Sequence, residues 1–295
     1  MKTIALLPVI TYPEPNPEMV VPKAVAMAAA LGAQLHALAI NVEIRNISNA
    51  LSRRLVDVPK MTREAEALCR DRGEAFLAKV VLEAKRAGVD STTGAVASNA
   101  PLLNDTAATQ ARYYDLVLCA WEAKNPTSRT TAQAIIFGSG RPTILLPEVE
   151  PVTKLHSVAI AWDGSRVAAR AVADAHQVLR RASKITVLTV TGEKSLQETD
   201  AAQCLAQGLN LRGLSAETMP FVSEDCPVEV SLQERAIEIG ADLMIMGAFG
   251  HTRLRDFVLG GATKGILSDV RLPIMLSSLF GTGCQGTAIN GVYLA

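Results

Sequence analysis

The chain has 295 residues, which is enough for two domains of ordinary size, each with its own hydrophobic core. Lysine plus arginine and aspartate plus glutamate both number 29, so the formal net charge is zero, and no block of like charge offers a surface for nucleic acid or a membrane. The longest apolar runs, such as VAMAAAL and ADLMIM, are far shorter than the about 18 residues that span a bilayer. We therefore expect neither nucleic acid nor a membrane as a partner.

The N-terminal residues and the cysteines indicate a cytoplasmic protein. MKTIALLPVI predicts a first strand and no signal peptide, because TYPEPNP follows where cleavage would need small residues. The five cysteines are widely separated and form no Cys-x-x-Cys pair, which is typical of free thiols in a reducing compartment. We interpret Cys119, in the strand-like run DLVLCAW, as a small buried hydrophobe. The four histidines are dispersed, so no metal site is predicted.

Short β-like runs alternate with helical patterns along the whole chain, as in a parallel sheet covered by helices. The strands predicted in the first half are residues 3–9, 34–40, 91–97, 115–121 and 142–147. Those predicted in the second half are residues 157–163, 184–190, 215–222, 242–248 and 273–277. The predicted fold class is α/β: two tandem five-stranded parallel-sheet domains with helices on both faces, in a Rossmann-like arrangement.

The repeated pattern predicts a duplicated unit. We assign residues 1–150 to a first domain, residues 151–278 to a second domain and residues 279–295 to a tail outside the fold. The first half has a surplus at residues 43–61, ahead of its second predicted helix. We interpret this surplus as a surface excursion, with a lid as the alternative.

A ligand site is predicted where the strand order of the second half reverses, at the carboxyl ends of its first and fourth strands. These ends are AWDGSR (161–166) and GAFGHTRLRDFVLGGATKG (247–265). The second segment has glycines at 247, 250, 260, 261 and 265. A glycine-rich turn between a strand and a helix presents main-chain N–H groups to phosphate oxygens with no side chain in the way. The residues therefore favour a phosphate-bearing ligand.

The spacing Gly247-x2-Gly250-x9-Gly260, followed by a small residue, resembles the nucleotide-binding motif of the universal stress protein family, G-x2-G-x9-G-(Ser/Thr). IAWDGS and RLPIMLS add to this resemblance, which is strongest over residues 156–278. It implies two tandem domains of the adenine-nucleotide alpha-hydrolase-like fold and a regulatory role in the stress response. The implied ligand is ATP, with or without Mg²⁺.

The resemblance also implies the residues that contact the nucleotide. They are Asp163, Val190, Gly247, Gly250, Gly260, Gly261 and Ala262. In this assignment Asp163 lies by the nucleoside and the main chain near Val190 meets the adenine edge. The first two glycines flank the ribose and first phosphates, and the last three amides bind the later phosphates. Gly261 departs from the motif, and the missing hydroxyl removes one hydrogen bond, about 0.5–1.5 kcal/mol.

The first half departs further from the motif. It has Trp121, Glu122 and Pro126 where the second half has open glycines, and no aspartate matches Asp163. We interpret the first half as a degenerate copy that has lost the site and pairs with the second as an intramolecular pseudo-dimer. The sequence leaves open whether the chain also forms a homodimer.

Enzyme motifs are missing from the chain: there is no G-x4-G-K-(Ser/Thr) loop and no G-x-S-x-G elbow. We therefore favour an ATP-binding regulatory protein, with at most slow ATP hydrolysis in which Asp163 helps to hold Mg²⁺. The alternative is a scaffold protein of the same fold that binds no nucleotide. An electron-transfer or hydrolytic enzyme is a third hypothesis.

Overall fold

A computed structural model of the chain describes residues 2–44, 57–191, 200–223, 226–248 and 261–279. The strands are β1 (Ile4–Ile10), β2 (Gln34–Glu43), β3 (Ser91–Asn99), β4 (Leu116–Ala120), β5 (Thr143–Leu146), β6 (Ser157–Ala161), β7 (Lys184–Thr191), β8 (Ala216–Val222), β9 (Leu243–Gly247) and β10 (Ile274–Ser277). The helices are α1 (Val20–Leu31), α2 (Val58–Ala87), η2 (Ala100–Leu102), α3 (Leu103–Ala111), α4 (Pro126–Gly138), α5 (Arg166–Asp174), α6 (His176–Leu179), α7 (Ala201–Leu211), α8 (Val228–Glu238) and α9 (Gly261–Ile266).

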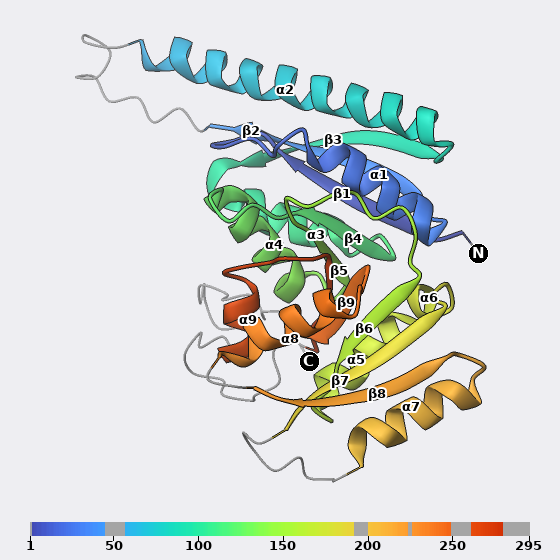
Figure 1. The fold of residues 1–295 in the computed structure, drawn as a ribbon. Helices are drawn as coiled ribbons and strands as arrows, with labels where there is room; N and C mark the ends of the chain where they lie inside the picture. Colours follow the sequence, from blue (N-terminus) through green and yellow to red (C-terminus); the bar gives the residue numbers. More distant parts are fainter. Residues whose placement is uncertain (1, 45–56, 192–199, 224–225, 249–260, 280–295) are drawn as a thin grey trace, which may run out of the picture.

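The described strands form one sheet of ten, in the order β3-β2-β1-β4-β5-β10-β9-β6-β7-β8 (Figure 1). Neighbouring strands are parallel except β5 and β10, which run antiparallel with Ile144 opposite Met275. The order of the first five strands therefore recurs in the second five in the opposite direction along the sheet, and the two sets meet at their fifth strands, β5 and β10. The predicted α/β class with two sets of five parallel strands is confirmed, and their fusion into one sheet is a finding of the structure.

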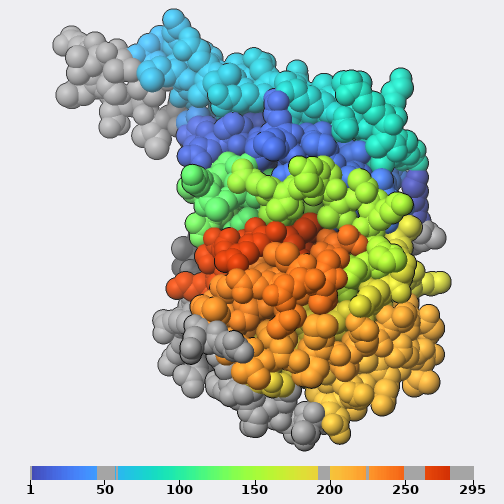
Figure 2. Space-filling view, in the orientation of Figure 1, coloured from blue at the N-terminus to red at the C-terminus, as the bar shows by residue number. Residues whose placement is uncertain are grey.

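Two buried hydrophobic clusters cover the two faces of the sheet. One takes its helical residues from α1, α5, α6, α7 and most of those of α2, and the other mainly from α3, α4, α8 and α9. Successive side chains of β1 point to opposite faces of the sheet, so Leu7 belongs to the first cluster and Leu6 to the second. Both clusters contain residues of both halves, and Figure 2 shows the halves packed directly against each other.

The beginnings of the two halves are held in the same way. The carboxylate of Asp115 accepts a hydrogen bond from the main-chain N–H of Ile4 at 2.8 Å. The carboxylate of Asp242 accepts two, from His156 at 2.7 Å and Ser157 at 2.8 Å. Each aspartate directly precedes the fourth strand of its half and fastens it to the start of the first strand.

The structure bears on the predicted surplus at residues 43–61, and it also bears on membrane-spanning helices. The predicted surplus 43–61 is shorter, because Glu43 ends β2 and α2 already begins at Val58. The lid-or-excursion question concerns residues 45–56, and these lie outside the described residues, as does the tail after residue 279. No helix among the described residues has the length and apolar character to cross a membrane.

Candidate functional site

The order of the second five strands reverses between β6 and β9. From β6 the sheet continues to β7 and β8, and from β9 it continues to β10. Since β6, β7 and β9 are parallel, their carboxyl ends meet at one edge, and crevices at such a reversal hold ligands in open α/β sheets. Three of the predicted site residues, Asp163, Val190 and Gly247, stand at these strand ends.

Asp163 builds the turn between β6 and α5. Its Oδ1 accepts a hydrogen bond from the main-chain N–H of Ser165 at 2.9 Å, while Gly164 has a φ of +73°, where an L side chain would be strained. Ser165 caps α5, since its Oγ accepts from the N–H of Ala168 at 3.2 Å. Asp163 is nevertheless exposed, so its carboxylate can hold the turn and still face solvent at the sheet edge.

Trp162 is a structural residue of the site that the sequence analysis did not single out. Its main-chain N–H donates to Leu188 O at 2.9 Å, and its indole Nε1–H donates to Ala201 O at 3.2 Å. The hydroxyl of Thr189 donates to Trp162 O at 3.3 Å. These contacts join the ends of β6 and β7 to the start of α7. The aromatic residue directly before Asp163 in AWDGS is the signal that could have revealed it.

Val190 lies near the end of β7, half-buried, with Phe221 of β8 opposite it. The hydroxyl of the next residue, Thr191, donates to Phe221 O at 3.1 Å. The guanidinium of Arg235 on α8 stacks over the Phe221 ring, with its Cζ 5.4 Å from the ring centroid. Phe221 and Arg235 therefore place β8 and α8 beside the end of β7.

Gly247 ends β9 and lies directly against α5. A Cβ at this position would be 2.7 Å from Ala168 N and 2.7 Å from the carbonyl carbon of Val167, closer than real Cβ contacts allow. Gly265 is covered in a similar way by the side chain of Glu229 on α8. Helix packing thus accounts for Gly247, whatever ligand the region binds, whereas the flexible Glu229 side chain could move away from a Cβ at position 265.

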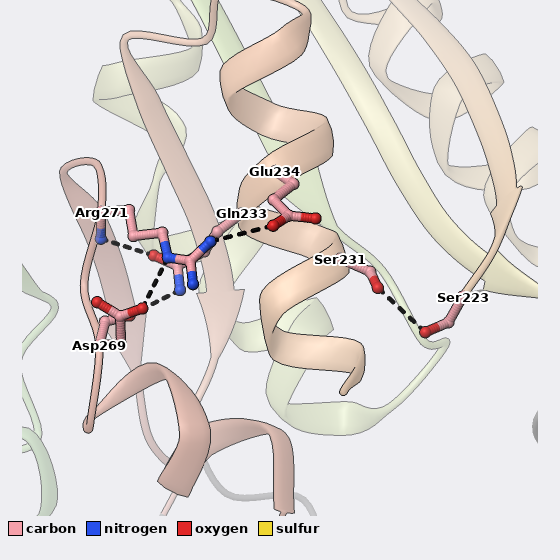
Figure 3. A network of polar contacts seen from close by, with 6 residues as sticks. All are labelled: Ser223, Ser231, Gln233, Glu234, Asp269 and Arg271. Atoms are coloured by element: carbon pink, nitrogen blue, oxygen red, sulfur yellow. Dashed lines mark hydrogen bonds and ion pairs between the residues drawn. The ribbon is translucent and has the colours of Figure 1, made fainter. Parts of the chain in front are cut away.

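The remaining predicted residues lie in or next to a segment without described structure. Gly250 and Gly260 fall outside the described residues, and Gly261 and Ala262 open α9. Figure 3 shows how the chain after α9 is fixed to α8. The buried side chain of Gln233 donates to Asp269 O at 2.7 Å and accepts from the N–H of Arg271 at 2.8 Å.

Charged and hydroxyl side chains extend this connection. The guanidinium of Arg271 pairs with Asp269 at 2.7 Å and with Glu234 at 3.2 Å, and Ser223 bonds to Ser231 on the other side of α8 (Figure 3). The buried bonds of Gln233 carry most of the energy, because exposed ion pairs contribute little. α8 therefore holds the chain between α9 and β10 in place.

At the corresponding edge of the first half, the chain closes over its own strand ends. Trp121 follows β4 and is 2% exposed, and its large side chain stands where the second half has Ala248. The main-chain bond from Trp121 N–H to Leu146 O, 2.9 Å, has its counterpart in Ala248 N–H to Ser277 O, 2.8 Å. The Oδ1 of Asn125 caps α4 by accepting from the N–H of Ser128 at 3.0 Å, and its Nδ2 donates to Pro15 O at 3.2 Å. The segment after β1 is thus fastened across the end of β4.

Two charged residues at this edge of the first half are also shielded from water, since Lys23 is buried and Glu122 is partly buried. The Lys23 ammonium donates to Pro147 O at 2.8 Å, and burial lowers the pKa of this buried lysine despite nearby carboxylates, Glu148 foremost. Burial raises the pKa of Glu122, against a hydrogen bond from Asn125 that lowers it. Its Oε1 is buried and has no hydrogen-bond partner among the described residues.

No protein-family model matches this sequence, and no curated protein matches it. Solved structures do resemble its fold. A universal stress protein from Archaeoglobus fulgidus DSM 4304 superimposes with a TM-score of 0.68 at 14% identity, over 93% of this chain and 96% of that one. A putative universal stress protein from Pseudomonas aeruginosa UCBPP-PA14 has a TM-score of 0.59 at 14% identity, over 94% and 93%. A functionally unknown protein from Pseudomonas aeruginosa PAO1 has a TM-score of 0.56 at 14% identity, over 92% of each chain. The chain therefore has the fold of the universal stress proteins over nearly its whole length.

Proposed function

We propose that this chain is a nucleotide-binding regulatory protein of the stress response, cytoplasmic, with one ATP site in its second half. The observation that carries the proposal is the exposed Asp163 turn beside the end of β9, from which the motif Gly247-x2-Gly250-x9-Gly260 departs. A carboxylate and a run of glycine amides at a strand-order reversal are suited to the ribose hydroxyls and the phosphates of a nucleotide. The fold of the universal stress proteins adds support.

The difference between the two halves supports a single site. In the first half, the bulky Trp121 stands where the second half has Ala248, and the Asn125 to Pro15 hydrogen bond crosses the edge at which the second half has the exposed Asp163. A nucleotide at the first edge would have to displace packed side chains, which costs free energy before any contact with the ligand forms.

In the proposed complex, Asp163 contacts the nucleoside, the main chain near Val190 meets the adenine edge, and the glycine amides from 247 to 262 surround the phosphates. Mg²⁺, when bound, would take Asp163 and phosphate oxygens as ligands. The described residues contain no group of three or more His, Cys, Asp or Glu side chains that could hold a metal ion. The phosphates are therefore needed to complete its coordination.

Isothermal titration of the full chain with Mg-ATP tests the proposal. We expect one nucleotide per chain and at least about a tenfold loss of affinity, 1.4 kcal/mol, for Gly250→Val. Ala123→Val is the matched control, because Ala123 follows the last residue of β4 by three positions as Gly250 follows the last residue of β9. This control should bind like the parent chain, since it changes only the first half.

Asp163→Asn separates the charge of Asp163 from its role in the turn, because the amide oxygen can still accept the Ser165 N–H. We expect this variant to keep the stability of the parent and to bind Mg-ATP more weakly. If titration of the folded parent chain with millimolar Mg-ATP shows no heat of binding, the proposal is wrong.

The second candidate function is a scaffold protein that binds no nucleotide. Two observations favour it: Gly247 is explained by helix packing alone, and Gly261 lacks the hydroxyl of the motif. Absence of any binding heat from the folded parent at millimolar Mg-ATP would favour this candidate, whereas unchanged binding by Gly250→Val would mean that the nucleotide site lies elsewhere. A continuous phosphate-release assay measures the slow hydrolysis that the nucleotide-binding proposal permits.

A further inference from the structure

The two edges of the ten-stranded sheet differ in how they are protected. The sheet ends in β8 on one side and in β3 on the other. Natural edge strands avoid pairing with other chains through proline, charged side chains or a covering segment. β8 has Pro220 and an ion pair of 2.8 Å between Glu217 and Lys184. β3, with the sequence STTGAVASN, has neither a proline nor a charged residue.

β3 is long and regular, and no described strand pairs with its outer edge. Its nine residues pair in parallel with β2 from Ser91 opposite Leu35 to Asn99 opposite Glu43. In the part of the chain that the structure describes, β3 pairs with no other strand. All of its residues except Ser98 are exposed or half-exposed. One row of main-chain N–H and C=O groups is therefore available to another strand.

The helix beside this edge adds apolar surface. α2 lies at the same end of the sheet as β3 and forms the outermost layer there (Figures 1 and 2). In its last two turns, just before β3 begins, Val81 is 44% and Leu82 is 51% exposed. Burying an edge bordered by aliphatic side chains contributes more favourable free energy than burying an edge bordered by charged side chains.

We propose that this edge binds a second copy of the chain, with the two β3 strands antiparallel about a two-fold axis at Ala95. A two-fold contact places every residue of β3 opposite a residue of β3 in the second copy, so a charged side chain in this strand would lie close to the same charge in the other copy. β3 has no charge to repel its copy. A register centred on Ala95 pairs all nine residues and sets Gly94 opposite the partner subunit's Val96.

The size match favours this register. Residues directly opposite across antiparallel strands share a face of the sheet, and the small Gly94 leaves room for the larger valine side chain. Gly94 is already crowded on its own side, since a Cβ there would lie 3.2 Å from His36 Nε2. The paired strands would join two sheets into one and remove the unprotected edge from both copies.

Sedimentation velocity of the full chain at several concentrations tests the proposal. We expect the parent to approach twice the 31.3 kDa mass of one chain as its concentration rises. Ala95→Lys places two lysines opposite each other at the axis and should yield single chains, as should Ala95→Glu. An equimolar mixture of the two variants should restore the dimer, because opposite charges then face each other. That recovery also shows that both variants are folded.

The matched control places the same charges on the other edge strand. Val222 ends β8 and is 63% exposed, so Val222→Lys and Val222→Glu should sediment like the parent. A parent that stays a single chain at every concentration would overturn the proposal. So would Ala95→Lys and Ala95→Glu variants that dimerise like the parent, or that remain single chains when mixed.

Discussion

Gly247 and Ala168 touch without a side chain between them. A Cβ at position 247 would lie 2.7 Å from the main-chain nitrogen of Ala168, so the end of β9 rests directly on the first turn of α5. The capping residue Ser165 is bonded to that same nitrogen. The start of α5 is therefore held both by its own cap and by the glycine of the neighbouring strand.

Gly247→Ala should destabilise the chain, because the new methyl group would overlap main-chain atoms that cannot move independently of α5. We expect a loss of about 1–3 kcal/mol in the free energy of unfolding, as for other overpacked sites. Urea unfolding followed by circular dichroism measures it. Gly208→Ala is the control: it lies inside α7 with nothing within 4 Å of the new methyl group, and should stabilise the chain by about 0.5–1 kcal/mol. Equal stability of Gly247→Ala and the parent would contradict this packing.

Gly247 also shows where prediction from the sequence reaches its limit. The five-glycine pattern predicts an anion site, but the sequence cannot separate a glycine that a ligand needs from one that a helix needs. The strands were predicted well because most of them are buried on both faces and read as short apolar runs, such as LVLCA in β4. The antiparallel junction of β5 and β10 was not predicted, since TILL and IMLS look like any other buried strand.

Removing Asp242 should cost more stability than removing its counterpart in the first half, Asp115. Asp242 accepts two main-chain hydrogen bonds and Asp115 accepts one, and a hydrogen bond to a charged group contributes about 1.5–3 kcal/mol. We expect a loss of about 3 kcal/mol for Asp242→Ala and about 1.5 kcal/mol for Asp115→Ala in urea unfolding. The reverse order would show that the two halves are not fastened in the way described.

The stability of the chain should depend on pH through Lys23. Burial lowers the pKa of its ammonium below the ordinary 10.5, so the unfolded chain holds this proton more firmly than the native chain. Between the native pKa and 10.5 the unfolded state binds more protons, and the free energy of unfolding rises with pH. Lys23→Met lacks this titration. Urea unfolding of both chains from neutral pH to about pH 11 should show that the free energy of unfolding of the parent rises relative to that of the variant. If the two free energies change with pH in the same way, this effect is ruled out.

Thiol reagents should distinguish the cysteines by burial. Cys204 and Cys226 are exposed, while burial raises the pKa of Cys119 to about 12 and also raises that of Cys69. Because the thiolate is the reacting form, brief treatment with iodoacetamide at neutral pH should label Cys204 and Cys226 and spare Cys69 and Cys119. Peptide mass mapping measures this, and the same treatment in urea should label Cys69 and Cys119 as well. Early labelling of Cys119 would mean that β4 opens readily.

The antiparallel contact between β5 and β10 has a consequence for the behaviour of the chain on dilution. Both strands belong to one polypeptide, and only residues 147–156 lie between β5 and β6. A linker this short keeps the two halves at a high local concentration, so the contact between β5 and β10 does not dissociate when the protein is diluted. Two separate subunits joined by the same strands would fall apart under those conditions.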